Sequence, residues 1–251
     1  MVLSVELSEV LAPALVAGVM VALVHAPLGI EVLRRGIIFI DLAVAQIAGL
    51  GLVLANLIFE APHEIFVQAA ALSGALIAGL FFRRVENNSP EYQEAIIGCC
   101  FVVAASLTIL AFANHPHGGD EMRHLLSGQL LFVTWEDLVK HFPIYVVILS
   151  VWFLKPAWRG GVAFYLLFSV AITSSVQLTG VYIVFSSLIL PALAAVNSPR
   201  PHLVAWTVGV LAVVYGILIS VVFDAPAGPV IVVSFVFSST LTVIVRKLNI
   251  L

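Results

Sequence analysis

Long apolar runs separated by short polar segments cover almost the whole chain. A run of about 20 apolar residues has the length of a helix that crosses a membrane. The pattern predicts nine such helices, at residues 10–28, 37–59, 65–82, 94–113, 142–154, 162–178, 181–196, 203–223 and 230–245, with polar loops at 85–93 and 115–141 and a basic turn at 155–161. We therefore expect an all-α fold, a polytopic transmembrane helical bundle of about eight or nine spans that forms a single domain over residues 1–251.

The composition supports a membrane protein and excludes some functions. Hydrophobic residues make up 62% of the chain and charged residues 10%, whereas soluble domains have roughly 45–50% and 25%. The net charge of −3 does not indicate a nucleic-acid partner, and the partner predicted instead is the lipid bilayer. The pattern G-x-x-x-x-G-K-[ST] does not occur in the sequence, so hydrolysis of a nucleotide through a P-loop is excluded.

Residues 171–196 differ from the other apolar runs because small and polar residues interrupt their first half. These residues are Thr173, Ser174, Ser175, Gln177, Thr179 and Gly180. Polar groups without partners are costly in hydrocarbon, and small residues let helix backbones approach closely. We expect this stretch to lie inside the bundle, with the other helices packed around it. Ala71, Ala75 and Gly79, at four-residue spacing, predict a second close-packing face.

Basic residues fall on one side of the predicted spans. They are Arg34, Arg35, Arg83, Arg84, Lys155, Arg159, Arg200, Arg246 and Lys247. The positive-inside rule then places the C-terminus in the cytoplasm and the N-terminus outside. The tryptophans Trp135, Trp152, Trp158 and Trp206 are predicted to be interfacial anchors, and His25 is predicted to be a packed or interfacial histidine rather than a metal ligand.

Asp41 is the clear carboxylate at membrane depth, and it lies in the motif FIDLAVAQIAGLG. A charge there costs about 2.5–3.5 kcal/mol on insertion scales unless it faces protein or water. One interpretation is that Asp41 snorkels or caps the helix beside Arg34 and Arg35. The other is that Asp41 faces a translocation path. Gln46, five residues further on, lies about 140° around the helix from Asp41 and does not share its face squarely.

A polar loop between the fourth and fifth spans carries His115, His117, Asp120, Glu121 and His124. Imidazole and carboxylate ligands suit zinc, manganese or iron. The sequence HPHGG is also ordinary turn chemistry, and both interpretations stay open. The residues alone therefore predict a transporter with a polar interior. A gradient-driven transporter or channel, and a scaffold without coupling, are the alternatives.

Four segments in this order resemble the membrane permease subunits of ABC importers for zinc, manganese and iron. They are RRGIIFIDLAVAQIAGLG (34–51), HPHGGDEMRHLLSGQLLFVTWEDL (115–138), FYLLFSVAITSSVQLTGVYIVFSSLILPALAA (164–195) and GILISVVFDAPAGPVIVV (216–233). The resemblance implies a permease homodimer in the bacterial inner membrane, a pair of cytoplasmic ABC ATPases and an extracytoplasmic metal-binding protein. It implies no catalytic residue and no bound cofactor, with the divalent metal ion as the transported substrate.

The resemblance also assigns roles to single residues. Relatives carry a histidine four residues after the aspartate of the second span, where this chain has Ala45; aligned from Gly51, the histidine falls on Gln46. We expect Asp41 and Gln46 on the translocation path, and His115, His117 and Asp120 where the ion enters. Relatives couple to the ATPase through the segment before residue 164. Here that segment is short, and Lys155, Trp158 and Arg159 are the residues expected to couple, helped by Arg83 and Arg84.

Overall fold

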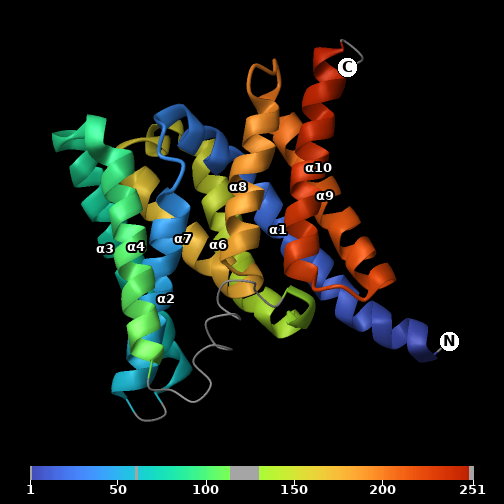
Figure 1. The fold of residues 1–251 in the computed structure, drawn as a ribbon, viewed down its shortest axis with the longest axis horizontal. Helices are drawn as coiled ribbons and strands as arrows, with labels where there is room; N and C mark the ends of the chain where they lie inside the picture. The colour runs from blue at the N-terminus through green and yellow to red at the C-terminus, as the bar shows by residue number, and fades with distance from the viewer. Residues whose placement is uncertain (1, 60–61, 114–129, 249–251) are drawn as a thin grey trace. The chain divides into compact units, whose positions relative to one another are not determined.

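The computed structural model describes residues 2–59, 62–113 and 130–248, and every regular element in these ranges is helical (Figure 1). The α-helices are α1 (Val2–Arg35), α2 (Ile40–Ile58), α3 (Glu64–Asn88), α4 (Gln93–Phe112), α6 (Trp135–Leu154), α7 (Gly161–Thr179), α8 (Val181–Ala195), α9 (Pro201–Phe223) and α10 (Ala227–Lys247). Three short 3-10 helices accompany them: η1 (Pro90–Tyr92), η2 (Leu130–Phe132) and η3 (Pro156–Arg159). The predicted all-α fold is confirmed.

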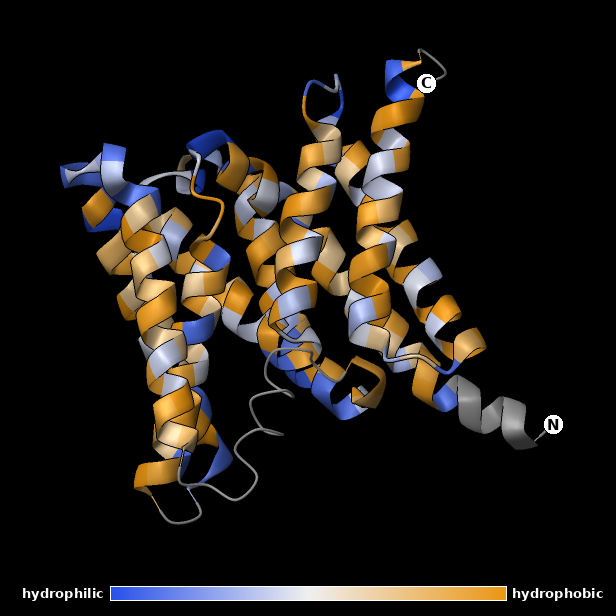
Figure 2. Cartoon of the chain, viewed as in Figure 1, coloured by the Kyte–Doolittle hydropathy of each residue, from blue (hydrophilic) through white to orange (hydrophobic). Residues whose placement is uncertain are grey.

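Eight helices of the described chain are long and apolar enough to cross a membrane, and α8, with 15 residues, is shorter. Figure 2 shows that apolar residues dominate the helices and that hydrophilic residues gather at helix ends. In hydrocarbon a helix satisfies all its interior backbone hydrogen bonds by itself, which is why such apolar sequence adopts this fold. The predicted number of about eight or nine spans is confirmed.

Several of the predicted boundaries were wrong. The first span ends at Arg35 of α1 rather than at 28. The loop at 85–93 is mostly helical, because α3 continues to Asn88 and η1 begins at Pro90. The fifth span begins at Trp135 rather than at 142. Thr134 and Asp137 explain this earlier start: Asp137 accepts a hydrogen bond from the Thr134 backbone N–H at 3.0 Å, and the Thr134 hydroxyl oxygen accepts one from the Asp137 N–H at 3.2 Å. This reciprocal pair is a capping box, which fixes a helix start.

The break between α7 and α8 lies where the sequence predicts it. α7 ends at Thr179, α8 begins at Val181, and Gly180 between them has a φ of 80°. Residues with a side chain rarely adopt this conformation. The polar first half of the stretch is buried as expected, since Ser174, Ser175 and Thr179 are each less than 5% exposed.

The chain forms two compact units, and each is described by itself. Unit 1 comprises Met1–Arg35, Ser127–Tyr145 and Leu178–Leu251, and unit 2 comprises Gly36–Leu126 and Val146–Gln177. In unit 1, α1 packs against α8 and α9, and α10 packs against α8 and α9. Glycines permit these contacts: a Cβ at Gly29 of α1 would overlap the carbonyl oxygen of Leu188, and one at Gly209 of α9 would lie 3.1 Å from the Cβ of Ala22.

The basic residues of α1 and α10 lie at one end of the helices of unit 1. Arg246, in the last turn of α10, donates to the carbonyl of Ala194 in the last turn of α8 at 2.8 Å. α1 runs antiparallel to α9, because Gly18 meets Val213 whereas Leu23 accepts a hydrogen bond from the Trp206 indole N–H at 2.9 Å. The C-terminal arginines of α1 therefore lie at the end where α8 and α10 finish and α9 begins. This grouping agrees with the predicted cytoplasmic side.

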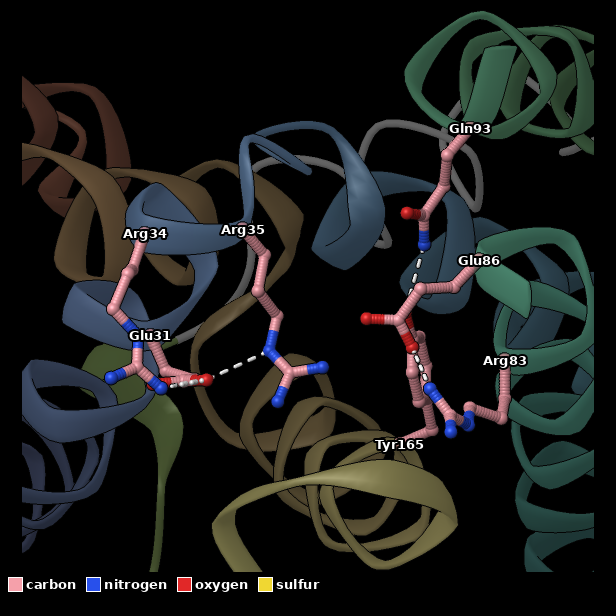
Figure 3. A network of polar contacts seen from close by, with 7 residues as sticks. All are labelled: Glu31, Arg34, Arg35, Arg83, Glu86, Gln93 and Tyr165. Carbon is pink, nitrogen blue, oxygen red and sulfur yellow. Dashed lines mark hydrogen bonds and ion pairs between the residues drawn. The ribbon is translucent and has the colours of Figure 1, made fainter. Parts of the chain in front are cut away.

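In unit 2, α2 packs against α3 and α4. A Cβ at Gly51 of α2 would lie 2.8 Å from the carbonyl oxygen of Ala70 in α3. α4 and α7 are joined by a buried hydrogen bond of 2.8 Å from the Gln93 amide to the Tyr165 hydroxyl (Figure 3). The predicted close-packing face on α3 is confirmed, since Ala71, Ala75 and Gly79 are all buried.

Candidate functional site

Asp41 is the second residue of α2, and its side chain is fully buried. Neither carboxylate oxygen has a hydrogen-bond partner among the described residues. Arg34 and Arg35 instead form ion pairs of 2.6 and 2.8 Å with Glu31, one turn earlier on α1 (Figure 3). Because its side chain is fully buried, Asp41 does not snorkel toward water, and its place on a translocation path stays a prediction. A buried ionisable group of this kind in a membrane helix is typical of an ion pathway.

Glu94, in the first turn of α4, lies close to Asp41, and the sequence analysis missed it. Its Oε1 accepts a hydrogen bond of 3.1 Å from the backbone N–H of Phe39, the N-cap residue of α2. Its Oε2 is buried and has no hydrogen-bond partner among the described residues. The carboxylates of Glu94 and Asp41 are near enough to interact electrostatically. No local sequence signal reveals this pair, because only the packing of α4 on α2 creates it.

Gln46 lies on α2 and is 5% exposed. Its amide donates a hydrogen bond of 3.3 Å to the hydroxyl oxygen of Thr108 on α4, and the Thr108 hydroxyl donates to the carbonyl of Ala104 at 2.9 Å. Buried polar groups in membrane helices commonly form such interhelical bonds. Gln46 therefore holds α2 against α4, a structural contact that the sequence analysis did not predict.

A polar row on α7 faces the interior of unit 2. Ser169 is fully buried, and its carbonyl accepts a hydrogen bond of 2.8 Å from the Thr173 hydroxyl. The Ser169 hydroxyl oxygen has no hydrogen-bond partner among the described residues. Gly79 of α3 makes room for it, because a Cβ at Gly79 would lie 2.5 Å from that oxygen. Polar atoms are thus available inside unit 2 on α7 as well as on α2 and α4.

His25 is fully buried in unit 1, and its Nδ1 lies 2.7 Å from the hydroxyl oxygen of Ser187 on α8. The same hydroxyl donates to the carbonyl of Val184 at 3.0 Å. The sequence analysis predicted a packed or interfacial histidine rather than a ligand, and the packing is confirmed. His25 thus links α1 to α8.

The segment at 155–161 contains the 3-10 helix η3, and contacts within unit 2 fix its position. The Arg159 Nε donates to the carbonyl of Trp152 at 2.8 Å, and its guanidinium carbon lies 5.8 Å from the centre of the Trp152 ring. Trp152 is 3% exposed, so its prediction as an interfacial anchor was wrong; it packs against Phe164. Trp158 is 53% exposed, and Lys155 is exposed. The segment is therefore held in place, and the Trp158 ring and the Lys155 ammonium group are exposed on its surface.

Arg83 is half-buried and forms an ion pair with Glu86 on the same helix (Figure 3). Arg84 is exposed. Arg84 is therefore the freer of the two to meet a partner. His115, His117 and Asp120 lie outside the described residues. Among residues 2–59, 62–113 and 130–248, no group of three or more His, Cys, Asp or Glu side chains could hold a metal ion.

Apolar helices around a buried carboxylate and a polar, small-residue interior are typical of a membrane transporter. The chain belongs to the ABC 3 transport family, whose sequence pattern matches residues 7–159 and 161–246. Two relatives are similar over most of their length. The high-affinity zinc uptake system membrane protein ZnuB of Haemophilus influenzae is 24% identical and is aligned over 95% of this chain and 98% of its own. The manganese transport system membrane protein MntC of Halalkalibacterium halodurans is 25% identical over 87% of this chain and 81% of its own.

A solved structure, PsaBC from Streptococcus pneumoniae in complex with Fab, shares the fold with a TM-score of 0.73. Its sequence identity is 21%, and the match covers 93% of this chain and 91% of that chain. The family resemblance found in the sequence is confirmed. Family membership and eight apolar helices together make this chain a multi-pass protein of the inner membrane.

Proposed function

We propose that this chain is the membrane permease of an ABC importer that carries zinc or manganese. The observation that carries the proposal is the end-to-end match: the family pattern covers nearly all of the chain, and relatives named for zinc and manganese transport align over most of it. Iron remains an expectation from the resemblance alone. Permease subunits of ABC importers are not themselves ATPases, and ATP hydrolysis takes place on a separate subunit.

The permease works with three partners. A cytoplasmic ABC ATPase supplies energy, an extracytoplasmic metal-binding protein delivers the ion, and a second copy of this chain completes the path. The whole chain, residues 1–251, acts as one transmembrane permease domain that binds no cofactor of its own. Support comes from the match of the family pattern on both sides of residue 160.

The ion passes Asp41, beside Gln46, inside unit 2. Asp41 supports this assignment because its two oxygens are buried and have no hydrogen-bond partner among the described residues. Gln46 contributes by fixing α2 on α4 through Thr108. At the opposite side of the membrane, His115, His117 and Asp120 receive the ion from the binding protein, as their place in an extracytoplasmic loop of the predicted topology implies.

Coupling to the ATPase takes place at η3. A partner must push on a rigid element to transmit a rotation, and the hydrogen bond from Arg159 to Trp152 makes η3 one. The exposed side chains of Trp158 and Lys155 then contact the ATPase. Arg159 holds the segment in place through its hydrogen bond to Trp152. Arg84 adds a positive charge from the end of α3.

A cellular experiment tests the function. The gene is deleted in its host, and growth and the metal content of the cells are measured when zinc or manganese is limiting. Loss of accumulation of one of these metals, restored by the gene and equally lost on deletion of the partner ATPase, is the expected result. Accumulation that survives loss of every candidate ATPase would instead indicate a gradient-driven carrier or a channel.

A further inference from the structure

Contacts within unit 2 connect η3 to the start of α7. Arg159 of η3 is bonded to the carbonyl of Trp152, and the Trp152 ring packs against Phe164 with ring centres 6.4 Å apart. Tyr165, the next residue, meets Phe164 edge-on at 5.3 Å between ring centres. Phe164 and Tyr165 are both fully buried. Close-packed interiors transmit strain, so a displacement of η3 reaches the first turns of α7.

The Tyr165 hydroxyl continues this set of contacts from α7 to α4. It accepts a hydrogen bond of 2.8 Å from the amide of Gln93, the first residue of α4 (Figure 3). Gln93 is 6% exposed and Tyr165 is fully buried. A buried donor that loses its partner destabilises the protein, so the start of α4 follows α7 when α7 moves.

The start of α4 is in turn joined to α2. Glu94, the residue after Gln93, accepts a hydrogen bond of 3.1 Å from the backbone N–H of Phe39, the N-cap residue of α2. Further along the same two helices, Gln46 donates to the hydroxyl of Thr108. α2 and α4 are therefore fixed to each other at two levels, and a movement of the start of α4 carries α2 with it.

We propose that the hydrogen bond between Gln93 and Tyr165 transmits the displacement of η3 to α4 and α2, and that Gln93 and Tyr165 are positioning residues for transport. The inference rests on the proposed function, in which the ATPase contacts η3. Both side chains are buried, so neither can contact the ATPase. Without this bond the ATPase still binds η3 and hydrolyses ATP, but α4 and α2 follow less completely, and fewer metal ions cross for each ATP.

The number of metal ions transported per ATP tests the proposal. It is measured in proteoliposomes that contain the full chain and its partner ATPase, as radioactive zinc or manganese taken up against ATP hydrolysed on addition of the metal-loaded binding protein. Tyr165→Phe keeps the ring against Phe164 and removes the hydroxyl. It should retain stimulated hydrolysis and lower the ratio of metal to ATP by about two- to thirtyfold, the span that substitutions along connected residues produce.

A second substitution shows whether the bond itself is responsible. Gln93→Leu removes the amide at similar size and should lower the ratio as much as Tyr165→Phe. The double variant should lower it no further, because each single substitution already removes the whole bond. A further fall in the double variant equal to the sum of the two single effects would mean that the two residues act separately, and it would overturn the proposal.

Trp206→Phe, in unit 1, is the matched control. It also keeps an aromatic ring and removes an interhelical hydrogen bond, the one from the indole N–H to the carbonyl of Leu23 at 2.9 Å. Its ratio of metal to ATP should equal that of wild type. The proposal is overturned if Tyr165→Phe keeps the wild-type ratio, if Trp206→Phe lowers it equally, or if Tyr165→Phe loses stimulated hydrolysis as well. Absence of ATP-driven uptake by wild type would instead overturn the proposed function.

Discussion

The Nδ1 of His25 and the hydroxyl oxygen of Ser187 lie 2.7 Å apart in the interior of unit 1, and this contact joins α1 to α8. Ser187→Ala should lower the free energy of unfolding by about 0.6–1.7 kcal/mol, between the mean and the maximum measured for hydrogen bonds between membrane helices. Thermal unfolding in detergent measures the change. Ser186→Ala is the matched control, because the Ser186 hydroxyl bonds to Tyr182 in its own helix. If both variants lost the same unfolding free energy, the contact with His25 would not contribute to stability.

Gly79 gives a second stability prediction. A Cβ at this position would lie 2.5 Å from the Ser169 hydroxyl oxygen and 3.1 Å from the Tyr165 carbonyl oxygen. Gly79→Ala should therefore destabilise the protein by about 1–3 kcal/mol, as overpacking does.

Gly98, in α4, is the control for that substitution, because a Cβ there would meet nothing within 4 Å. Gly98→Ala should leave stability unchanged or raise it by up to about 1 kcal/mol, because alanine is the better helix former. Unfolding temperatures compare the two variants. If Gly79→Ala proved as stable as Gly98→Ala, the close packing of α3 on α7 would be incorrect.

Substitution of Asp41 should reduce transport without reducing stability. Asp41→Asn removes a buried ionisable group, whose charged form costs about 2.5–3.5 kcal/mol on insertion scales, so its unfolding temperature should equal or exceed that of wild type. Metal uptake should nevertheless fall at least about tenfold, as changes around metal sites typically cause. Asp224→Asn makes the same chemical change at an exposed position and should affect neither quantity. Normal uptake by Asp41→Asn would remove this residue from the path.

Trp158 tests the coupling surface. Its ring is 53% exposed on η3, so Trp158→Ala should leave the unfolding temperature unchanged. In the complex it should abolish most of the ATPase stimulation by the metal-loaded binding protein. Trp135→Ala is the control, because the Trp135 side chain is similarly exposed, at 55%, and lies at the start of α6. Full stimulation of Trp158→Ala would move the coupling site to another segment.

The fold was largely predictable from the sequence because hydrophobic runs and helix breakers act locally. The break at Gly180 follows from six small or polar residues that precede an aliphatic run. The start of α6 was missed although Thr134 and Asp137 carry a capping signal, because polar residues in the first turns hide the apolar pattern. The ion pairs of Glu31 with Arg34 and Arg35 also follow from three- and four-residue spacing.

The candidate site was less predictable because its geometry depends on tertiary packing. Asp41 was found from its charge at membrane depth, which is a property of one residue. Glu94 was not found, because it stands 53 positions later in the sequence and becomes a neighbour only when α4 packs on α2. Burial of Trp152 likewise depends on Phe164 and Arg159, which lie on later segments.

The most direct test of the central claim is metal uptake by proteoliposomes that contain this chain and its partner ATPase, with the metal-loaded binding protein outside the vesicle and ATP inside. Radioactive zinc or manganese should accumulate with ATP, and no accumulation should occur with ADP or with an ATPase that cannot hydrolyse ATP. Equal accumulation without ATP, or by vesicles that contain this chain alone, would contradict its function as the permease of an ABC importer.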